Sequence, residues 1–231
     1  MKDNLHVSEC FYSIQGEGQT MGIPAVFLRL SGCNLLCKSD NWVCDTIEVW
    51  RKGVKTPFKD VIKKEWVKRI QEGAHLVITG GEPLLHDKAV DNFLTWFRNE
   101  FNFIPIVEIE TNGTFTPSIN LLKKVSYWNC SPKLSTSGEP YKKRMNDHSL
   151  RIINKYNSIF KFVISCEEDI LEVLQDFSPF IDMKKAVFMP SGDTQELLDK
   201  SRVLVANQCI KHGIRYSERL HVVIWNQKTG V

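Results

Sequence analysis

Three cysteines close together in the sequence are the residues best suited to chemistry. Cys33, Cys37 and Cys44 share one short stretch. Three thiolates are one ligand short of closing a structural metal site, and a [4Fe-4S] cluster normally takes four Cys, one for each iron. A cluster held by three Cys would leave one iron open, and an open position on a metal is where a reactant binds. The spacing therefore indicates a metal centre that can bind a further ligand.

A zinc site completed by a histidine is the competing interpretation of this stretch. No His lies between Cys33 and Cys44, and the spacing does not match a zinc-finger pattern. The remaining cysteines lie far apart in the sequence, and we expect them to be small buried hydrophobic side chains: Cys10, Cys130, Cys166 and Cys209.

Composition and charge narrow the class of protein. A chain of 231 residues, 42% hydrophobic and 25% charged, is long enough for one large domain with a sizeable core. A net charge of +3 without a dense basic run gives no indication of nucleic-acid binding. No apolar stretch approaches a membrane span, and the N-terminus lacks the apolar core of a signal peptide. We therefore expect a cytoplasmic protein, not bound to a membrane, whose cysteines are free thiols or metal ligands.

Short apolar runs alternate with amphipathic stretches, which is typical of an α/β domain with a mostly parallel sheet. About six such units are fewer than the eight of a full barrel, so an incomplete barrel and an open wound sheet both fit. We expect a single domain over 1–231, with a Lys-rich solvated insertion at about 47–72 and a last strand at 219–225. The other expected strands are 25–30, 76–79, 106–110, 127–130, 160–165 and 186–189, and the expected helices are 88–101, 117–124 with Thr116 as its cap, 167–177 and 194–212.

Polar or glycine-containing segments follow most of the expected strands. In parallel α/β folds the carboxyl ends of the strands meet at one edge of the sheet, where ligands bind. Each segment alone is better interpreted as a turn, but their shared position beside the three cysteines indicates a single site. The segments are Ser31-Gly-Cys33, Gly80-Gly-Glu-Pro83, Thr111-Asn-Gly113, Ser131-Pro-Lys133, Ser165 and Pro190-Ser-Gly192.

Read in order, these motifs resemble those of the radical S-adenosylmethionine (SAM) enzymes and, more narrowly, of the 7-carboxy-7-deazaguanine synthase family. The resemblance covers the chain and is strongest from 11 to 133. It departs in one place, because six residues separate Cys37 from Cys44 where most of the family has two. A loop absorbs extra residues at small entropic cost, so the departure concerns the path of the cluster loop at 31–46 more than the role of Cys44. The matching motifs are Phe11-Tyr-Ser-Ile-Gln-Gly-Glu-Gly18, Phe27-Leu-Arg-Leu-Ser-Gly-Cys-Asn34, Cys44-Asp-Thr46, Thr79-Gly-Gly-Glu-Pro83, Glu110-Thr-Asn-Gly113 and Ser131-Pro-Lys133.

The resemblance implies a fold, a reaction and partners. The fold would be an incomplete (β/α)6-type barrel, with a [4Fe-4S] cluster on the three cysteines and SAM on the open iron. The reaction would convert 6-carboxy-5,6,7,8-tetrahydropterin to 7-carboxy-7-deazaguanine with loss of ammonia, in a route to 7-deazapurines such as queuosine. The partners would be a second copy in a homodimer and an electron donor such as flavodoxin or ferredoxin. A radical-SAM activase that installs a glycyl radical and a non-catalytic iron–sulfur or zinc protein are the alternatives.

The resemblance assigns SAM to the segments that follow the strands. Gly80 and Gly81 would let the backbone approach the SAM amino group, and Glu82 would accept a hydrogen bond at or near that ammonium. A helix-start carboxylate is the simpler alternative for Glu82, and a turn for Asn112. The other expected SAM contacts are Val43, Asp45, Asn112, Ser131, Pro132, Lys133, Met189, Pro190, Ser191 and Gly192.

The segment 11–18 is expected to bind the pterin. Gln15 can pair with the amide-like edge of a pterin through both amide atoms, and Glu17 can accept from its N–H donors. Arg29 lies in an apolar strand, where burial is costly unless the charge is paired, and it offers a bidentate fork to the substrate carboxylate. A polar hairpin turn is the alternative for the motif around Gln15. Further expected substrate contacts are Ile14, Gly16, Thr79 and Val231.

Thr46 is expected to bind magnesium. In the family that the chain resembles, the Thr of Cys-Asp-Thr binds an Mg²⁺ that also binds the substrate. Mg²⁺ prefers oxygen ligands and retains waters, so one hydroxyl together with substrate oxygens and water is chemically reasonable. Asp45 would position those waters by hydrogen bonds without binding the ion itself. A helix cap at Asp45-Thr46 is the alternative interpretation.

Overall fold

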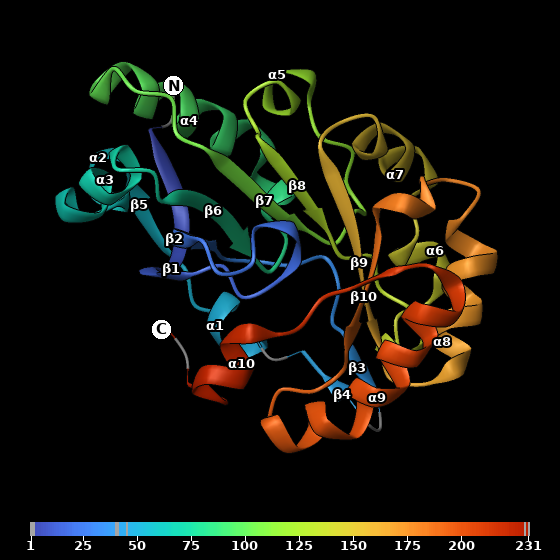
Figure 1. Cartoon of the computed structure of the whole chain (residues 1–231). Helices are drawn as coiled ribbons and strands as arrows, with labels where there is room; N and C mark the ends of the chain where they lie inside the picture. The colour runs from blue at the N-terminus through green and yellow to red at the C-terminus, as the bar shows by residue number, and fades with distance from the viewer. Residues whose placement is uncertain (1–2, 40–41, 45, 229, 231) are drawn as a thin grey trace.

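The computed structural model describes residues 3–39, 42–44, 46–228 and 230 (Figure 1). These residues form a nine-stranded sheet in the order β11-β10-β9-β8-β7-β6-β2-β1-β5 and a separate hairpin of β3 and β4. Neighbouring strands from β2 to β11 are parallel, whereas β1 is antiparallel to both of its neighbours. Because β5 and β11 are the two ends of this order, the sheet is open. The strands are β1 (Asn4–Ile14), β2 (Pro24–Leu30), β3 (Lys38–Ser39), β4 (Trp42–Val43), β5 (Val54–Pro57), β6 (His75–Gly80), β7 (Val107–Thr111), β8 (Tyr127–Cys130), β9 (Ser158–Ile164), β10 (Ala186–Pro190) and β11 (Arg215–Tyr216).

Helical segments join the parallel strands, because each crossover must return the chain to the same edge of the sheet. In Figure 1 the helices α4, α5, α7 and α8 lie along the outer side of the sheet. None of the helices in the described ranges is long and apolar enough to cross a membrane. The α-helices are α1 (Ile47–Trp50), α2 (Phe58–Val61), α3 (Lys64–Gln71), α4 (Asp87–Phe101), α5 (Ile119–Leu122), α6 (Tyr141–Arg144), α7 (Asp147–Asn154), α8 (Glu167–Glu172), α9 (Gln195–His212) and α10 (Leu220–Trp225); η4 (Val173–Phe177) is a π-helix, and η1 (Gly18–Thr20), η2 (Pro83–His86), η3 (Ser135–Ser137) and η5 (Met183–Lys185) are 3₁₀ turns.

The two faces of the sheet differ in chemistry. Successive side chains of a strand point to opposite faces. On β7, Val107 and Ile109 belong to the main hydrophobic core, so Glu108 and Glu110 point to the other face. Lys161 of β9 likewise lies between two core phenylalanines in the sequence and points away from that core. We call this second face the inner face, and it carries the buried charged side chains of the sheet.

The strands follow the sequence pattern closely. The expected strand at 127–130 is confirmed as β8, and the other strands expected in the parallel sheet agree with β2, β6, β7, β9 and β10 to within two residues. The long helices α4 and α9 are confirmed, and the helix expected at 167–177 begins as α8 and continues as the π-helix η4.

Two expectations are wrong. The tail at 219–225 contains helix α10 instead of a strand: the amide of Leu220 donates to the carbonyl oxygen of Gly16, so the tail packs on the segment 15–18 and does not extend the sheet beside β11. The helix α5 begins at Ile119, and Ser118 caps it by accepting a hydrogen bond from the amide of Leu121 over 3.3 Å. Thr116 is therefore not its cap.

The segment at 47–72 has exposed charged side chains, as its composition indicates, but it also contributes to the core. Its strand β5 pairs with β1. Trp50, Phe58 and Ile70 are buried. The segment thus forms the end of the sheet beyond β1.

Candidate active site

The cluster loop returns two of its cysteines to the same place through a hairpin. Lys38 of β3 pairs with Val43 of β4, and the amide of Cys44 donates to the carbonyl oxygen of Cys37 over 3.1 Å. Four of the six residues between these cysteines form the paired strands of this hairpin. The long gap does not separate the two cysteines in space.

The three thiols influence one another electrostatically. Burial raises the pKa of Cys37 to about 11, the ammonium of Lys133 opposes this rise, and Cys44 and Cys33 add to it. A thiolate ligand must lose its proton, so metal binding at Cys37 would have to displace that proton. In the described part of the chain no group of three His, Cys, Asp or Glu could hold a single metal ion.

The glycines after β6 allow the end of that strand to touch the cluster loop. A Cβ on Gly81 would lie 2.3 Å from the carbonyl oxygen of Gly32 and 2.6 Å from Cβ of Cys33. A Cβ on Gly80 would lie 2.3 Å from the carbonyl oxygen of Leu30. Only glycine permits this approach, because no other residue lacks a Cβ. The predicted contact of Gly80 and Gly81 with a SAM amino group stays a prediction.

Glu82 is completely buried and organises the neighbouring strand end. Its Oε1 accepts from the amide of Leu84 over 2.9 Å and from the hydroxyl of Thr111 over 2.8 Å, and its Oε2 accepts from the amide of Asn112 over 2.7 Å. Burial raises the pKa of Glu82 to about 7 against these hydrogen bonds. The bond to Leu84 makes it the N-cap of η2, which is the alternative that the sequence leaves open. A ligand ammonium nearby would favour its charged form.

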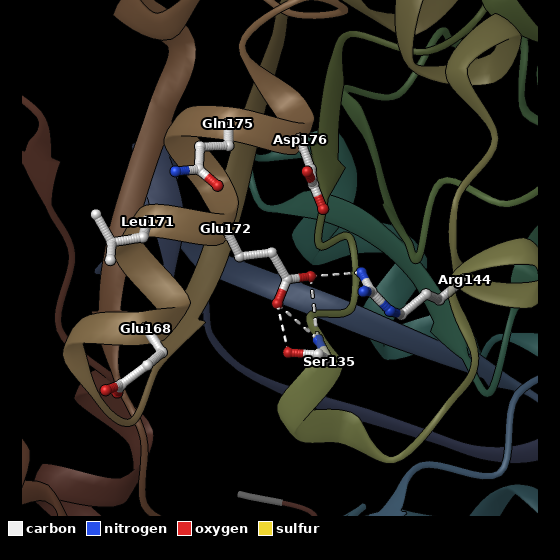
Figure 2. Close-up of a pocket in the computed structure, with 7 residues that line it drawn as sticks. All are labelled: Ser135, Arg144, Glu168, Leu171, Glu172, Gln175 and Asp176. Carbon is white, nitrogen blue, oxygen red and sulfur yellow. Dashed lines mark hydrogen bonds and ion pairs between the residues drawn. The ribbon is translucent and has the colours of Figure 1, made fainter.

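A side chain from another part of the chain holds the segment Ser131-Pro132-Lys133 in place. The ammonium of Lys133 donates to Oγ of Ser131 over 3.3 Å, while Nη1 of Arg144 donates to the carbonyl oxygen of Lys133 over 3.0 Å. Figure 2 shows Arg144 and Glu172 facing each other. Their Nη1 and Oε1 lie 2.6 Å apart, at a hollow of about 350 Å³. This ion pair holds the backbone of Lys133, whose ammonium acts on the cluster thiols.

The last predicted SAM segment also lies at the carboxyl edge of the sheet. Met189 and Pro190 end β10 and are buried. The amide of Ser191 donates to the carbonyl oxygen of Ile164, the last residue of β9, over 3.0 Å. The carbonyl oxygen of Gly192 accepts from Nη1 of Arg219 over 2.6 Å. The segment is thereby linked to the C-terminal tail.

The side chain of Gln15, just after the end of β1 at Ile14, is fully engaged by the protein. Its Nε2 donates to Oε2 of Glu108 and to Oε1 of Glu110, each over 3.1 Å, and its Oε1 accepts from the amide of Glu17 over 3.3 Å. Only 3% of the residue is exposed. Pairing of both amide atoms with a pterin stays a prediction and requires these bonds to be exchanged.

The C-terminal tail packs directly on the segment 15–18. The amide of Leu220 donates to the carbonyl oxygen of Gly16 over 2.8 Å, and the amide of Gly18 donates to Oγ of Ser217 over 3.0 Å. A Cβ on Gly16 would lie 2.2 Å from Nδ1 of His221. The tail therefore closes over the segment that is predicted to bind the pterin.

Glu17 is held between two cations. Its Oε2 lies 2.8 Å from Nζ of Lys161, and its Oε1 lies 3.1 Å from Nε of Arg219. Lys161 also lies 2.6 Å from Oε2 of Glu110. Burial alone would raise the pKa of Glu17, but the charges of Lys161 and Arg219 outweigh it and hold that pKa well below its usual range. Glu17 is thus an ionised acceptor.

Arg29 and Thr79 are register partners on β2 and β6, so their side chains share the inner face. The cost of partly burying Arg29 is met by Glu9 of β1, whose Oε1 accepts from Nε over 2.7 Å. The predicted contact of Arg29 with a substrate carboxylate stays a prediction.

Glu108 is a functional candidate that the sequence analysis missed. Oε2 of this fully buried carboxylate accepts from Thr20 and Asn129, each over 2.8 Å, and its Oε1 lies 2.5 Å from Nδ1 of His75. Burial would raise its pKa, but these hydrogen bonds together lower it. The alternation Val-Glu-Ile-Glu-Thr over 107–111 carries the signal, since it puts two carboxylates on one face of an apolar strand.

Thr46 occupies the N-cap position of α1, but its side chain makes no cap hydrogen bond. Its Oγ1 lies 3.5 Å from Sγ of Cys44 instead. Val43, on the other side of Cys44, is 50% exposed. Asp45 and Val231, which the sequence assigns to SAM and to the substrate, lie outside the described residues.

These side chains form two adjoining zones. Thiols and glycine turns lie at the carboxyl edge of the sheet, and ionised hydrogen-bonding groups lie on its inner face. Such groups suit a small heterocycle with neighbouring donors and acceptors.

Comparisons with known proteins agree with this chemistry. A family model described as a 4Fe-4S single cluster domain matches residues 14–125. The 7-carboxy-7-deazaguanine synthase of Halobacterium salinarum is 34% identical over 96% of the chain and 91% of that protein. The enzyme of the same name from Pyrobaculum aerophilum is 30% identical over 98% of the chain and 97% of that protein. The crystal structure of QueE from Escherichia coli shares the fold, with a TM-score of 0.70 and 24% identity over 94% of the chain and 95% of that structure.

Proposed function

The chain belongs to the 7-carboxy-7-deazaguanine synthase family of radical-SAM enzymes, and we propose that the two adjoining zones perform the reaction of that family. The reaction converts 6-carboxy-5,6,7,8-tetrahydropterin to 7-carboxy-7-deazaguanine with loss of ammonia, in 7-deazapurine biosynthesis of the queuosine type. The observation that supports this function most strongly is sequence identity: the chain is 34% and 30% identical to two such synthases over nearly its whole length.

Cys33, Cys37 and Cys44 would hold the [4Fe-4S] cluster. When bound, the cluster and SAM supply the one-electron chemistry that starts the ring contraction. The hairpin of β3 and β4 supports this ligand set, because it brings Cys44 within a backbone hydrogen bond of Cys37. The nearby ammonium of Lys133 favours the thiolate of Cys37.

The carboxyl edge of the sheet would bind SAM. Lys133 offers a cation to a carboxylate, and the buried Glu82 sets the positions of Thr111 and Asn112 beside it. We assign the remaining SAM contacts to the segments that end the strands: Val43, Asp45, Gly80, Gly81, Ser131, Pro132, Met189, Pro190, Ser191 and Gly192.

The inner face would bind the pterin. Glu17 is ionised and can accept from the N–H donors of a pterin edge. Arg29 offers a cation to the substrate carboxylate, with Thr79 beside it as a hydroxyl donor. Gln15, with its neighbours Ile14 and Gly16, would lie at the same edge under the C-terminal tail, and Val231 would contact the substrate from the chain end.

Thr46 would bind Mg²⁺ together with oxygens of the substrate and water. Its hydroxyl makes no cap hydrogen bond to helix α1, so the interpretation as a magnesium ligand is favoured over the interpretation as a cap. Its position two residues after Cys44 would keep the cation near the cluster loop. Asp45 would order the waters of that ion.

The finer architecture follows the family. We propose that the open sheet is an incomplete (β/α)6-type barrel that works as a homodimer in the cytoplasm and receives electrons from flavodoxin or ferredoxin. The antiparallel strand β1 would continue the wall of the barrel beyond β2.

Two measurements on the reconstituted protein separate this function from its alternatives. Turnover of 6-carboxytetrahydropterin distinguishes the synthase from a glycyl-radical activase, which has no need for Gln15, Glu17 and Arg29 around a small heterocycle. Addition of SAM should change the EPR spectrum of the reduced cluster, since SAM binds the open iron. An unchanged spectrum would identify a fully ligated, non-catalytic centre.

A further inference from the structure

Lys161 is a buried cation that the proposed function leaves without a role. Only 1% of the residue is exposed. Its neighbours on the inner face, Ile159, Val163, Val187 and Met189, are apolar and pack together. A lysine at this position is costly unless it is paired, and an aliphatic residue would fill the space at lower cost. Its presence therefore indicates a task other than packing.

The ammonium of Lys161 joins two carboxylates from distant parts of the chain. Nζ lies 2.8 Å from Oε2 of Glu17 and 2.6 Å from Oε2 of Glu110. Glu17 has a second cation in Arg219. The other oxygen of Glu110 accepts from the amide of Gln15 over 3.1 Å. Of the described side chains that contact Glu110, Lys161 is therefore the one that carries a positive charge.

Without that charge the two carboxylates would repel each other. Burial alone raises the pKa of Glu110, Lys161 opposes the rise, and the charge of Glu17 adds to it. Loss of the ammonium would favour a proton on one carboxylate or a separation of the two. Either change removes an acceptor from the inner face.

We propose that Lys161 is a positioning residue that ties Glu17 to Glu110 and so presents two fixed acceptors to the amino-pyrimidinone edge of the substrate. This inference rests on the proposed function. The amino group and the ring N–H of that edge are adjacent donors, and carboxylate oxygens accept from such donors in strong hydrogen bonds. Lys161 itself touches no reacting atom in this account.

The test compares Lys161→Met with Lys185→Met. Lys185 is a matched control, because its ammonium donates to the carbonyl oxygens of Asn154 and Tyr156, over 2.6 and 2.7 Å, and it contacts no carboxylate there. In Lys161→Met we expect KM for 6-carboxytetrahydropterin to rise about 30-fold or more, the effect of removing one partner of a buried charge pair. The EPR change on adding SAM should persist. An unchanged KM in Lys161→Met would overturn the inference.

A second readout needs no substrate. A carboxylate that loses its cation has a folded-state pKa above its unfolded value, so its stabilising contribution is present at low pH and lost as the pH rises. The melting temperature of Lys161→Met should fall further below that of the wild type at pH 8 than at pH 5, whereas Lys185→Met should show the same deficit at both. Besides Lys161, the titratable and charged groups that face the carboxylates of Glu17 and Glu110 come from four parts of the chain. They are Arg219 and His221 from the C-terminal tail, His75 from β6, Glu108 from β7 and Cys130 from β8.

If Lys161→Met does not fold, the double variant Lys161→Met with Glu110→Gln keeps the buried charge balanced. The double variant is then compared with Glu110→Gln alone, and the loss of Lys161 should change the KM for the pterin little once Glu110 is neutral. A KM in the double variant far above that of Glu110→Gln would overturn the inference. If the wild type never turns over the pterin, but the melting-temperature deficit of Lys161→Met shows the predicted pH dependence, the proposed substrate is refuted and the tie between the carboxylates is established.

Discussion

The amide of Cys44 donates to the carbonyl oxygen of Cys37 over 3.1 Å, across a gap of six residues. This bond lies beside the paired strands β3 and β4 and places the third cysteine of the motif next to the second. The unusual spacing is thus a hairpin added to the cluster loop.

Packing of this hairpin depends on Gly138. A Cβ there would lie 2.2 Å from the carbonyl oxygen of Lys38, and its φ of 77° is in the left-handed region. We expect Gly138→Ala to displace the hairpin and lower the iron content per chain after reconstitution. Gly213→Ala is the matched control, with a φ of 64° and open space around its Cβ, and should cost only about 1 kcal/mol of stability. Full cluster occupancy in Gly138→Ala would count against the role of the hairpin.

Cys44 itself should be required for the cluster. Cys44→Ala leaves two thiolates, which cannot hold three irons of a cubane. We expect loss of the visible absorbance of the cluster and of the SAM-dependent EPR change. Cys209→Ala is the control, since this thiol lies on α9 and packs in the core, so its loss should leave the iron content unchanged. An intact, active cluster in Cys44→Ala would remove Cys44 from the ligand set.

Glu82 should make the stability of the apoprotein depend on pH. Its folded-state pKa of about 7 lies above the ordinary value of 4.5, so its contribution is fully present below pH 4.5 and is lost as the pH rises through 7. The shift corresponds to a loss on the order of 3 kcal/mol in the free energy of unfolding. Denaturant unfolding at pH 5 and pH 8 should show this loss in the wild type and not in Glu82→Gln. Equal pH dependence of the two proteins would contradict a titrating Glu82.

Arg29 should govern substrate affinity without affecting SAM. Arg29→Ala removes the cation proposed for the substrate carboxylate and leaves Glu9 without its partner. We expect KM for the pterin to rise by about 10-fold to 100-fold, as is typical when one partner of a charge pair is lost. Glu9→Gln keeps the guanidinium and should retain most of the affinity. Equal KM in the wild type and Arg29→Ala would assign the carboxylate to another group.

Thr46 should govern the response to magnesium. Thr46→Ala removes the hydroxyl, and we expect a weaker dependence of kcat/KM on the Mg²⁺ concentration. Thr46→Ser keeps the oxygen ligand and should retain the response. Titration of both variants with Mg²⁺ is the measurement. The same Mg²⁺ dependence in Thr46→Ala and in the wild type would show that another group binds the ion.

Local patterns predict much of the fold and part of the site. The apolar runs give the parallel strands, because a strand covered by helices needs long apolar stretches. The tail at 219–225 is wrongly predicted as a strand because its apolar residues suit a short helix as well, and its contact with the segment 15–18 joins distant parts of the chain that no local pattern relates. Lys161 escapes a search for motifs because it is the single charge in an apolar strand, and Glu108 escapes it because alternating carboxylates in a strand match no motif. Their role becomes visible only when β7 and β9 bring them to the same face.

The most direct test of the central claim is anaerobic turnover by the reconstituted protein. Reduced protein with SAM, Mg²⁺ and 6-carboxytetrahydropterin should form 7-carboxy-7-deazaguanine over many cycles, with ammonia released in equal amount and SAM regenerated. Absence of this product, from a protein whose cluster is intact and responds to SAM, would contradict the account.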